Sequence, residues 1–211
     1  IMKLLPRCVR RADRLVAVSG STAADLRHYW HIPPEKISVI YNGYDRKRFI
    51  PAAETGRGRY LLYISRIEHP GKNHLNLIKA YELLPEELRN KYALVLAGST
   101  WPGAEAVMVY ANHSPARANI SFIGFVADTE LPELYHNAAL YVFPSFFEGF
   151  GLSLAEAMAC GIPAVCSDTS SLAEVGGDAV LTFAPDRPEE MAAVIERVLN
   201  DPALRDRMVA A

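Results

Sequence analysis

Short apolar runs alternate with helical patterns along most of this chain, and this alternation restricts the possible folds more than any other feature. The runs are rich in Val, Ile, Leu, Tyr and Phe and cover residues 61–65, 93–97, 120–125, 140–143, 164–167 and 180–183. Helical patterns occupy residues 74–84, 105–112, 130–137, 152–159 and 188–199, and Asp201-Pro202 begins a further helix that the chain end cuts off at Ala211. Strands that alternate with helices predict an α/β fold, a doubly wound parallel sheet with helices on both faces.

The N-terminal third has a different pattern. We expect a strand at 15–19, a helix at 21–30 capped by Ser21 or Thr22, and a strand at 37–41. A polar stretch from 45 to 59, rich in basic residues and containing Pro and Gly, has the composition of a linker. We therefore divide the chain into a remnant of a preceding domain and junction (1–45), a linker (46–57) and the main domain (58–211). The first residue is Ile, which suggests a piece of a longer protein.

Composition narrows the function classes. Half of the 211 residues are hydrophobic, the formal charge is −2, and no apolar run approaches the ~20 residues of a membrane span. These values favour a globular protein without a nucleic-acid partner. Three cysteines without a C-x-x-C motif favour a reducing, cytoplasmic compartment, with Cys160 and Cys166 buried. A solvated helix face is favoured over contact with a bilayer for the basic residues Lys3, Arg7, Arg10, Arg11 and Arg14.

The segment 147–156 has the pattern of a phosphate site. Gly149 and Gly151 allow close approach of the backbone before a helix start, where the amides of Phe150, Gly151 and Leu152 could hold a diphosphate. Glu156 follows in an apolar run, where a carboxylate needs hydrogen-bond donors such as sugar hydroxyls. An ordinary glycine turn with Glu156 paired to a basic side chain is the alternative, and this segment alone leaves it open.

Ligands of doubly wound sheets bind at the carboxyl ends of the strands. Arg66 follows the first of the six runs and Lys72 completes the same loop, so both could neutralise a diphosphate on the glycine segment opposite. Gly98-Ser99 follows the second run, and Gly124 to Asp128 the third. No D-x-D pair or metal-ligand histidine spacing occurs, which predicts that no metal cofactor is required, and we expect His69 and His74 to be solvated.

Taken together, these segments resemble the retaining two-domain GT-B glycosyltransferases of family 4 / group 1, in particular their C-terminal donor-binding half. The matching motifs, in the family's order, are Val18-Ser19-Gly20-Ser21, Val39 to Asp45, Ser65-Arg66 with Lys72, Leu96-Ala97-Gly98, Phe122-Ile123-Gly124 and Pro144 to Gly151. Glu148 and Glu156 match the family's E-x7-E pattern. Each motif is weak alone, and the combination is specific.

The resemblance implies the following roles. Arg66 and Lys72 would bind the donor diphosphate together with the glycine-segment amides, and Glu148 would contact the transferred sugar. The catalytic residues would thus be Glu148, Arg66 and Lys72. The donor-binding residues would be Gly98, Ser99, Val126, Gly149, Phe150, Gly151, Leu152 and Glu156, with the ribose hydroxyls on Glu156 and the base near the backbone of Val126.

The implied function is transfer of a sugar from a UDP-, GDP- or ADP-sugar to a saccharide or glycolipid acceptor, with retention and without a metal. The acceptor site would belong to the preceding domain, and the longer protein could touch the inner face of the membrane. A non-catalytic sugar-nucleotide-binding module and a nucleotide-sugar 2-epimerase remain alternatives. An exposed strand at 37–41 could also pair with a second copy and form a homodimer.

Overall fold

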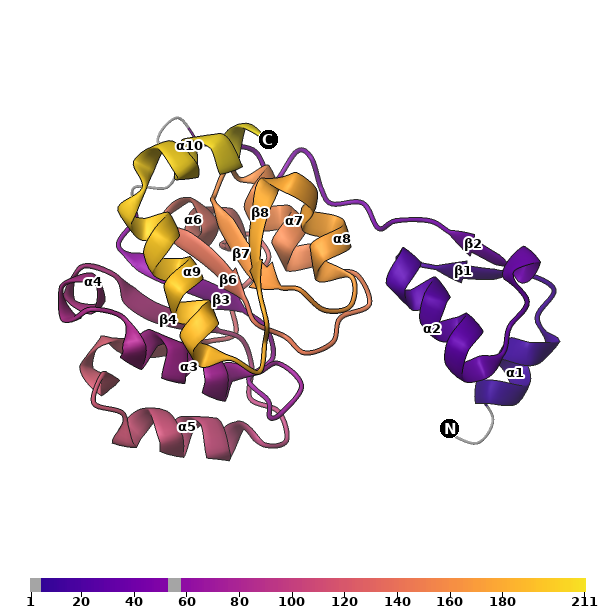
Figure 1. Cartoon of the computed structure of the whole chain (residues 1–211), viewed down its shortest axis with the longest axis horizontal. Helices are drawn as coiled ribbons and strands as arrows, with labels where there is room; N and C mark the ends of the chain where they lie inside the picture. The colour runs from indigo at the N-terminus through magenta and orange to yellow at the C-terminus, as the bar shows by residue number, and fades with distance from the viewer. Residues whose placement is uncertain (1–4, 53–57) are drawn as a thin grey trace.

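The computed structural model describes residues 5–52 and 58–211. Six parallel strands form the sheet of the larger part, in the order β5-β4-β3-β6-β7-β8 (Figure 1). Their bounds are β3 Tyr60–Ile64, β4 Ala93–Ala97, β5 Ile120–Gly124, β6 Leu140–Phe143, β7 Ala164–Ser167 and β8 Val180–Phe183. The direction of strand addition reverses between β3 and β6, so the expected doubly wound parallel sheet is confirmed.

Burial across the sheet explains why these runs are so apolar. Every residue of the inner strands β6 and β7 is buried, whereas the edge strand β5 has no buried residue. A strand covered by helices on both faces needs apolar side chains in both directions, while an edge strand tolerates polar ones. Cys160 and Cys166 are buried as expected.

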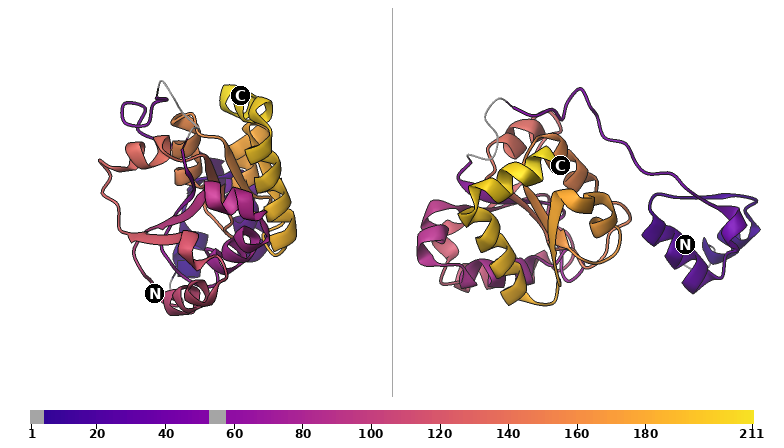
Figure 2. Two further views of the ribbon diagram at one scale, coloured as in Figure 1. Left: turned by 90° about the vertical axis from the view of Figure 1, so that its left-hand side faces the viewer. Right: turned by 45° about the horizontal axis from the view of Figure 1, so that its top comes forward.

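Helices cover both faces of this sheet. Helix α3 contacts both α5 and α9 on one face, and α7 packs against α8 on the other (Figures 1 and 2). The helix bounds are α3 His74–Leu83, α4 Glu86–Lys91, α5 Ala104–His113, α6 Leu131–His136, α7 Leu152–Ala159, α8 Leu172–Gly176, α9 Pro188–Asn200 and α10 Pro202–Ala210. The short 3-10 turns are η2 Arg117–Asn119 and η3 Gly177–Ala179. The sequence patterns missed α4 and α8, which are too short to show a helical period.

The N-terminal unit, residues 5–41, is a smaller layer beside this domain, joined to it by an extended segment (Figure 2). It consists of α1 Leu5–Arg11, β1 Leu15–Ala17, α2 Gly20–Trp30, η1 Pro34–Lys36 and β2 Ile37–Val39. Strands β1 and β2 pair in parallel, with Leu15 opposite Ile37. The expected strand, helix and strand are therefore present.

The cap expected for this helix was wrong. Neither Ser21 nor Thr22 is the N-cap of α2: Ser19 is, and its hydroxyl accepts a hydrogen bond from the Thr22 amide at 3.0 Å. Strand β1 ends at Ala17 and not at residue 19, and Ser19, with an extended backbone (φ −156°, ψ 162°), serves as the cap of α2.

Some expectations fall outside the described residues. Lys3 and positions 53–57 of the expected linker lie there, so the linker is described only in part. Within the described ranges, no helix is long and apolar enough to cross a membrane.

Candidate functional site

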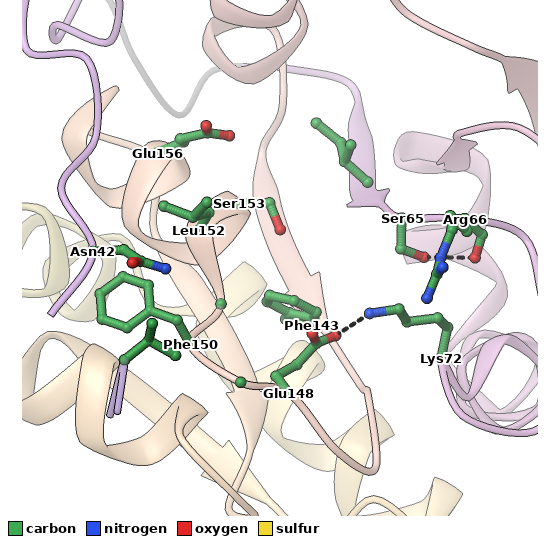
Figure 3. Close-up of a pocket in the computed structure, with 14 residues that line it drawn as sticks. Asn42, Ser65, Arg66, Lys72, Phe143, Glu148, Phe150, Leu152, Ser153 and Glu156 are labelled. Atoms are coloured by element: carbon green, nitrogen blue, oxygen red, sulfur yellow. Dashed lines mark hydrogen bonds and ion pairs between the residues drawn. The ribbon is translucent and has the colours of Figure 1, made fainter. Parts of the chain in front are cut away.

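A pocket of about 440 Å³ lies where the loops after β3 and β6 diverge. Because the strand order reverses between these two neighbours, their carboxyl ends leave an open crevice, the usual ligand position in such sheets. Figure 3 shows the lining residues, which come from the end of β3 and its loop, the end of β6 and its loop, and the first turns of α7. Val18 of the N-terminal unit and Asn42 of the extended segment complete the lining. Eight predicted site residues line it: Arg66, Lys72, Glu148, Gly149, Phe150, Gly151, Leu152 and Glu156.

The glycine segment has the backbone geometry of an anion site. Gly151 is the N-cap of α7 with φ 100°, and a Cβ there would lie 2.6 Å from a Leu172 methyl group. Only glycine fits both constraints. The cap has no side-chain hydrogen bond, so the first amides of α7 remain available toward the pocket, where the helix dipole is positive.

Lys72 and Glu148 contact one another directly. Lys72 Nζ lies 2.6 Å from Glu148 Oε1, and both side chains are largely buried (16% and 14% exposed) (Figure 3). The sequence predicted both residues for the site and did not predict the pair. In this arrangement, an anionic ligand must share Lys72 with Glu148.

Buried hydrogen bonds fix the loop that bears Lys72. Asn73, with φ 60°, donates its side-chain amide to the carbonyls of Pro144 (2.8 Å) and Pro185 (2.7 Å). The Tyr63 hydroxyl donates to the Lys72 carbonyl at 3.0 Å. These bonds join the two loops that bear Lys72 and Glu148, so the pair is held by the backbone as well as by charge.

The expectation that His69 and His74 are both solvated was wrong for one of them. His69 is exposed as expected, but His74 is fully buried, 3.2 Å from the Glu68 carbonyl and 3.3 Å from the Ser65 hydroxyl. Burial lowers the pKa of His74 to about 4. The hydrogen bond with the Glu68 carbonyl opposes this shift, and the charges of Lys72 and His69 lower the pKa further. His74 is the first residue of α3 and faces the core, which the sequence pattern did not indicate.

Glu156 is half-buried on α7, and the Tyr135 hydroxyl donates to its Oε2 at 2.9 Å. Burial raises the pKa of Glu156, the Tyr135 bond opposes this, and the charge of Asp128 adds to the rise. The basic partner considered as the alternative for Glu156 is not within ion-pair distance in the described ranges, although Arg48 is close enough to influence its pKa. One carboxylate oxygen thus has a partner, and the residue faces the pocket.

Gly98, Ser99 and Val126 lie outside the set of residues that line this pocket. A Cβ on Gly98, which has φ 138°, would overlap the Ser65 carbonyl oxygen, and the Ser99 carbonyl accepts from the Ile67 amide at 2.9 Å. Val126 packs against the core. Their contact with a donor stays a prediction.

The N-terminal unit reaches the glycine segment. Ser19 Oγ lies 2.8 Å and Thr22 Oγ1 3.2 Å from the Gly149 carbonyl oxygen. Glu174 on α8 accepts from the Gly20 amide (2.7 Å), the Ser21 amide (3.1 Å) and the Tyr41 hydroxyl (2.7 Å). The sequence gave no signal for Glu174, because its partners are more than 130 residues away.

Among the residues that the structure describes, no three His, Cys, Asp or Glu side chains are grouped so that they could hold a metal ion. The cationic groups that line the pocket are Arg66 and Lys72.

Comparison with known proteins identifies families for both parts. Residues 45–211 match the family model described as Glycosyl transferases group 1, and residues 1–48 match that of Glycosyltransferase Family 4. An O-antigen chain mannosyltransferase B of Escherichia coli is 42% identical over 147 residues, covering 70% of this chain and 38% of that protein. A serotype-specific mannosyltransferase of Escherichia coli is 34% identical over 206 residues, covering 92% of this chain and 25% of that protein. The chain thus spans well under half the length of these two relatives.

The fold of nearly this whole chain also occurs in a solved structure. The Anabaena protein HepE, crystallised with UDP and glucose, aligns with a TM-score of 0.86 at 20% identity, covering 99% of this chain and 60% of that one. At this identity the likeness establishes a common fold.

Proposed function

Because the chain belongs to the group 1 glycosyl transferases, we propose that its pocket binds the nucleotide diphosphate of a sugar donor. The longer protein would transfer the sugar to a saccharide or glycolipid acceptor, in polysaccharide or glycolipid synthesis. The observation that supports this best is the convergence of Arg66, Lys72 and the start of α7, which has no side-chain cap, on one pocket at the point where the strand order reverses. Two cationic side chains and a helix N-terminus together match the charge of a diphosphate.

The chemistry follows from this charge distribution. The bond between the sugar and the diphosphate becomes more polar as it breaks, so positive groups on the phosphate side stabilise the transition state more than the ground state. Arg66, Lys72 and the α7 amides would act on this leaving group. Glu148, 2.6 Å from Lys72, would face the transferred sugar and stabilise positive charge that develops on it. We also propose that the transferred sugar retains its anomeric configuration.

The donor is proposed as a UDP-, GDP- or ADP-sugar. The two mannosyltransferase relatives and the UDP and glucose of the HepE crystals support a nucleotide sugar. A thermal-shift panel of UDP-, GDP- and ADP-mannose and -glucose would identify the base and the sugar. We expect stabilisation by the donors of one base.

The proposal is tested by calorimetry on Arg66→Ala and Lys72→Ala. Each should weaken binding of the nucleoside diphosphate at least about tenfold, since each removes a charged contact of roughly 1.5–3 kcal/mol. Arg27→Ala, which changes an exposed arginine on α2 outside the pocket, is the control. Unchanged affinity in both pocket variants would refute the proposed site.

We propose that no metal bridges the diphosphate, because Arg66, Lys72 and the α7 amides supply the positive charge. Binding should then survive EDTA. Loss of binding with EDTA and recovery with magnesium or manganese would contradict this.

For the longer protein, we propose a cytoplasmic location and peripheral contact with the inner face of the membrane. Arg10 and Arg11 in the last turn of α1 support that contact.

The homodimer also remains a proposal, supported by the exposure of Val39 and Ile40 at the end of β2. Light scattering tests the homodimer, and co-sedimentation with vesicles tests the membrane contact.

A further inference from the structure

The loop after β4 runs beside the segment that bears Arg66. Ile67 donates its amide to the Ser99 carbonyl, and its own carbonyl accepts from the Trp101 amide, both at 2.9 Å. The glycines of this loop permit the close approach: a Cβ on Gly98 would overlap the Ser65 carbonyl oxygen, and one on Gly103, with φ 89°, would lie 2.7 Å from the His69 carbonyl oxygen. The loop is therefore tied by its backbone to both ends of the Arg66 segment.

Trp101 extends this support to the side chain of Arg66. The guanidinium carbon of Arg66 lies over the Trp101 ring, 4.4 Å from its centroid, while its Nη2 lies 3.5 Å from Glu68 Oε2. Arg66 is 48% exposed and Trp101 49% exposed, so neither is fixed by burial. A long side chain at the surface loses conformational entropy when it binds an anion, and a ring that already restricts it reduces this loss.

We propose that Trp101 is a positioning residue that holds the Arg66 guanidinium ready for the donor diphosphate. The inference rests on the proposed function, because it assumes that Arg66 binds the diphosphate. A cation–π contact uses the face of the ring and no N–H of the guanidinium, so it leaves the hydrogen-bond donors free. Glu68 differs, because its carboxylate occupies the same donors that a phosphate needs. The diphosphate would displace Glu68 and leave the Trp101 contact intact.

The test is a double-mutant cycle of Trp101→Ala and Arg66→Ala in this chain. The probes are UDP, GDP and ADP, with uridine, guanosine and adenosine as matched probes without phosphate. Trp101→Ala should weaken binding of the preferred diphosphate by about two- to fivefold, the range for an exposed cation–π contact, and should not change nucleoside affinity. In the Arg66→Ala background it should have no further effect. Trp101→Phe should restore most of the affinity, and Tyr29→Ala, which removes an exposed aromatic ring from α2, is the control.

A second measurement separates the two proposals. The NMR signal of the Arg66 Nε–Hε group, recorded without nucleotide, should be sharp in the parent and in Trp101→Phe and broadened in Trp101→Ala. Unchanged diphosphate affinity in Trp101→Ala, an equal loss in the Arg66→Ala background, or a loss of nucleoside affinity would overturn the role of Trp101. If Arg66→Ala itself leaves diphosphate affinity unchanged, the proposed function fails at Arg66, and the NMR signal still decides whether Trp101 orders this side chain.

Discussion

At the scale of single residues, the two glutamates of the pocket have opposite environments. Glu148 lies 2.6 Å from the ammonium group of Lys72, whereas Glu156 has no basic side chain within ion-pair distance in the described ranges and burial raises its pKa. The E-x7-E spacing predicted that both belong to one site. Only the structure shows that one is paired and that the other has a single hydroxyl donor, Tyr135.

Glu148→Gln should keep or increase affinity for the bare nucleoside diphosphate. The change removes a negative charge from the site and frees Lys72 for the phosphate. In the longer protein it should lower kcat, because the contact with the sugar matters in the transition state. Calorimetry and steady-state kinetics measure the two effects, with Glu189→Gln on α9 as the control. Weaker binding of the bare nucleotide would contradict the assignment of Glu148 to the sugar.

Glu156→Gln should weaken nucleotide binding by about tenfold without lowering thermal stability at neutral pH. The folded pKa of Glu156 lies above its ordinary value of 4.5, so ionisation costs the fold stability and protonation relieves that cost. In the parent, affinity should therefore fall as pH drops through this raised pKa, because the protonated carboxyl accepts hydroxyl groups poorly.

Titration of nucleotide affinity against pH, paired with melting temperatures, provides the check. A Glu156→Gln variant that melts well below the parent would assign the residue to the fold and not to the ligand.

At the scale of elements, two helices from distant parts of the chain meet at the glycine segment. The N-terminus of α2 lies against Glu174 of α8, and Ser19 and Thr22 contact the Gly149 carbonyl. Partial burial alone would raise the pKa of Glu174, but hydrogen bonds from Gly20, Tyr41 and Ser21 outweigh it and lower the pKa. An anionic side chain at a helix N-terminus is stabilised by the helix dipole.

Glu174→Ala should loosen the N-terminal unit from the larger part of the chain, residues 58–211. Since the folded pKa is lowered, the contact should be complete above the ordinary value of 4.5 and should be lost as pH falls through the lowered value. Amide hydrogen exchange at Gly20 and Ser21 should accelerate in the variant. Asp178→Ala, an exposed acid in η3, is the control. Unchanged protection of both amides would show that Glu174 does not hold α2.

At the scale of the whole molecule, the pocket is shared between two parts of the chain. Val18 and Asn42 line it together with residues of the larger part, 58–211. The chain spans 38% and 25% of the two mannosyltransferase relatives, and we expect the acceptor to be held by parts of such proteins that this chain does not match.

The purified 211-residue chain should therefore bind the donor and transfer no sugar. Orientation of donor and acceptor in a closed site lowers the activation barrier by on the order of 7–11 kcal/mol, and this chain would provide one wall of that site. A radiolabelled-sugar assay with saccharide and glycolipid acceptors measures this, with the longer protein as the positive control. Acceptor-dependent transfer by the chain alone would refute the expectation.

The sequence by itself determined the parallel sheet, the positions of its strands and the glycine segment before α7. These features depend on local patterns: alternation of apolar runs with helical periods, and glycines where the backbone must turn tightly. Arg66 and Lys72 were predictable because strand ends in such a sheet converge on one edge. Glu156 was predictable from its place in an apolar run, and Glu148 from the E-x7-E pattern of the family.

Only the tertiary structure decided which side chains meet. The Lys72–Glu148 pair, the support of Arg66 by Trp101 and the contact of Glu174 with α2 join residues separated by 76, 35 and 154 positions, respectively. The burial of His74 and the capping of α2 by Ser19 also depend on how loops pack after the sheet has formed. Local propensity has no information about such partners, since they are selected by the packing of distant segments against one sheet.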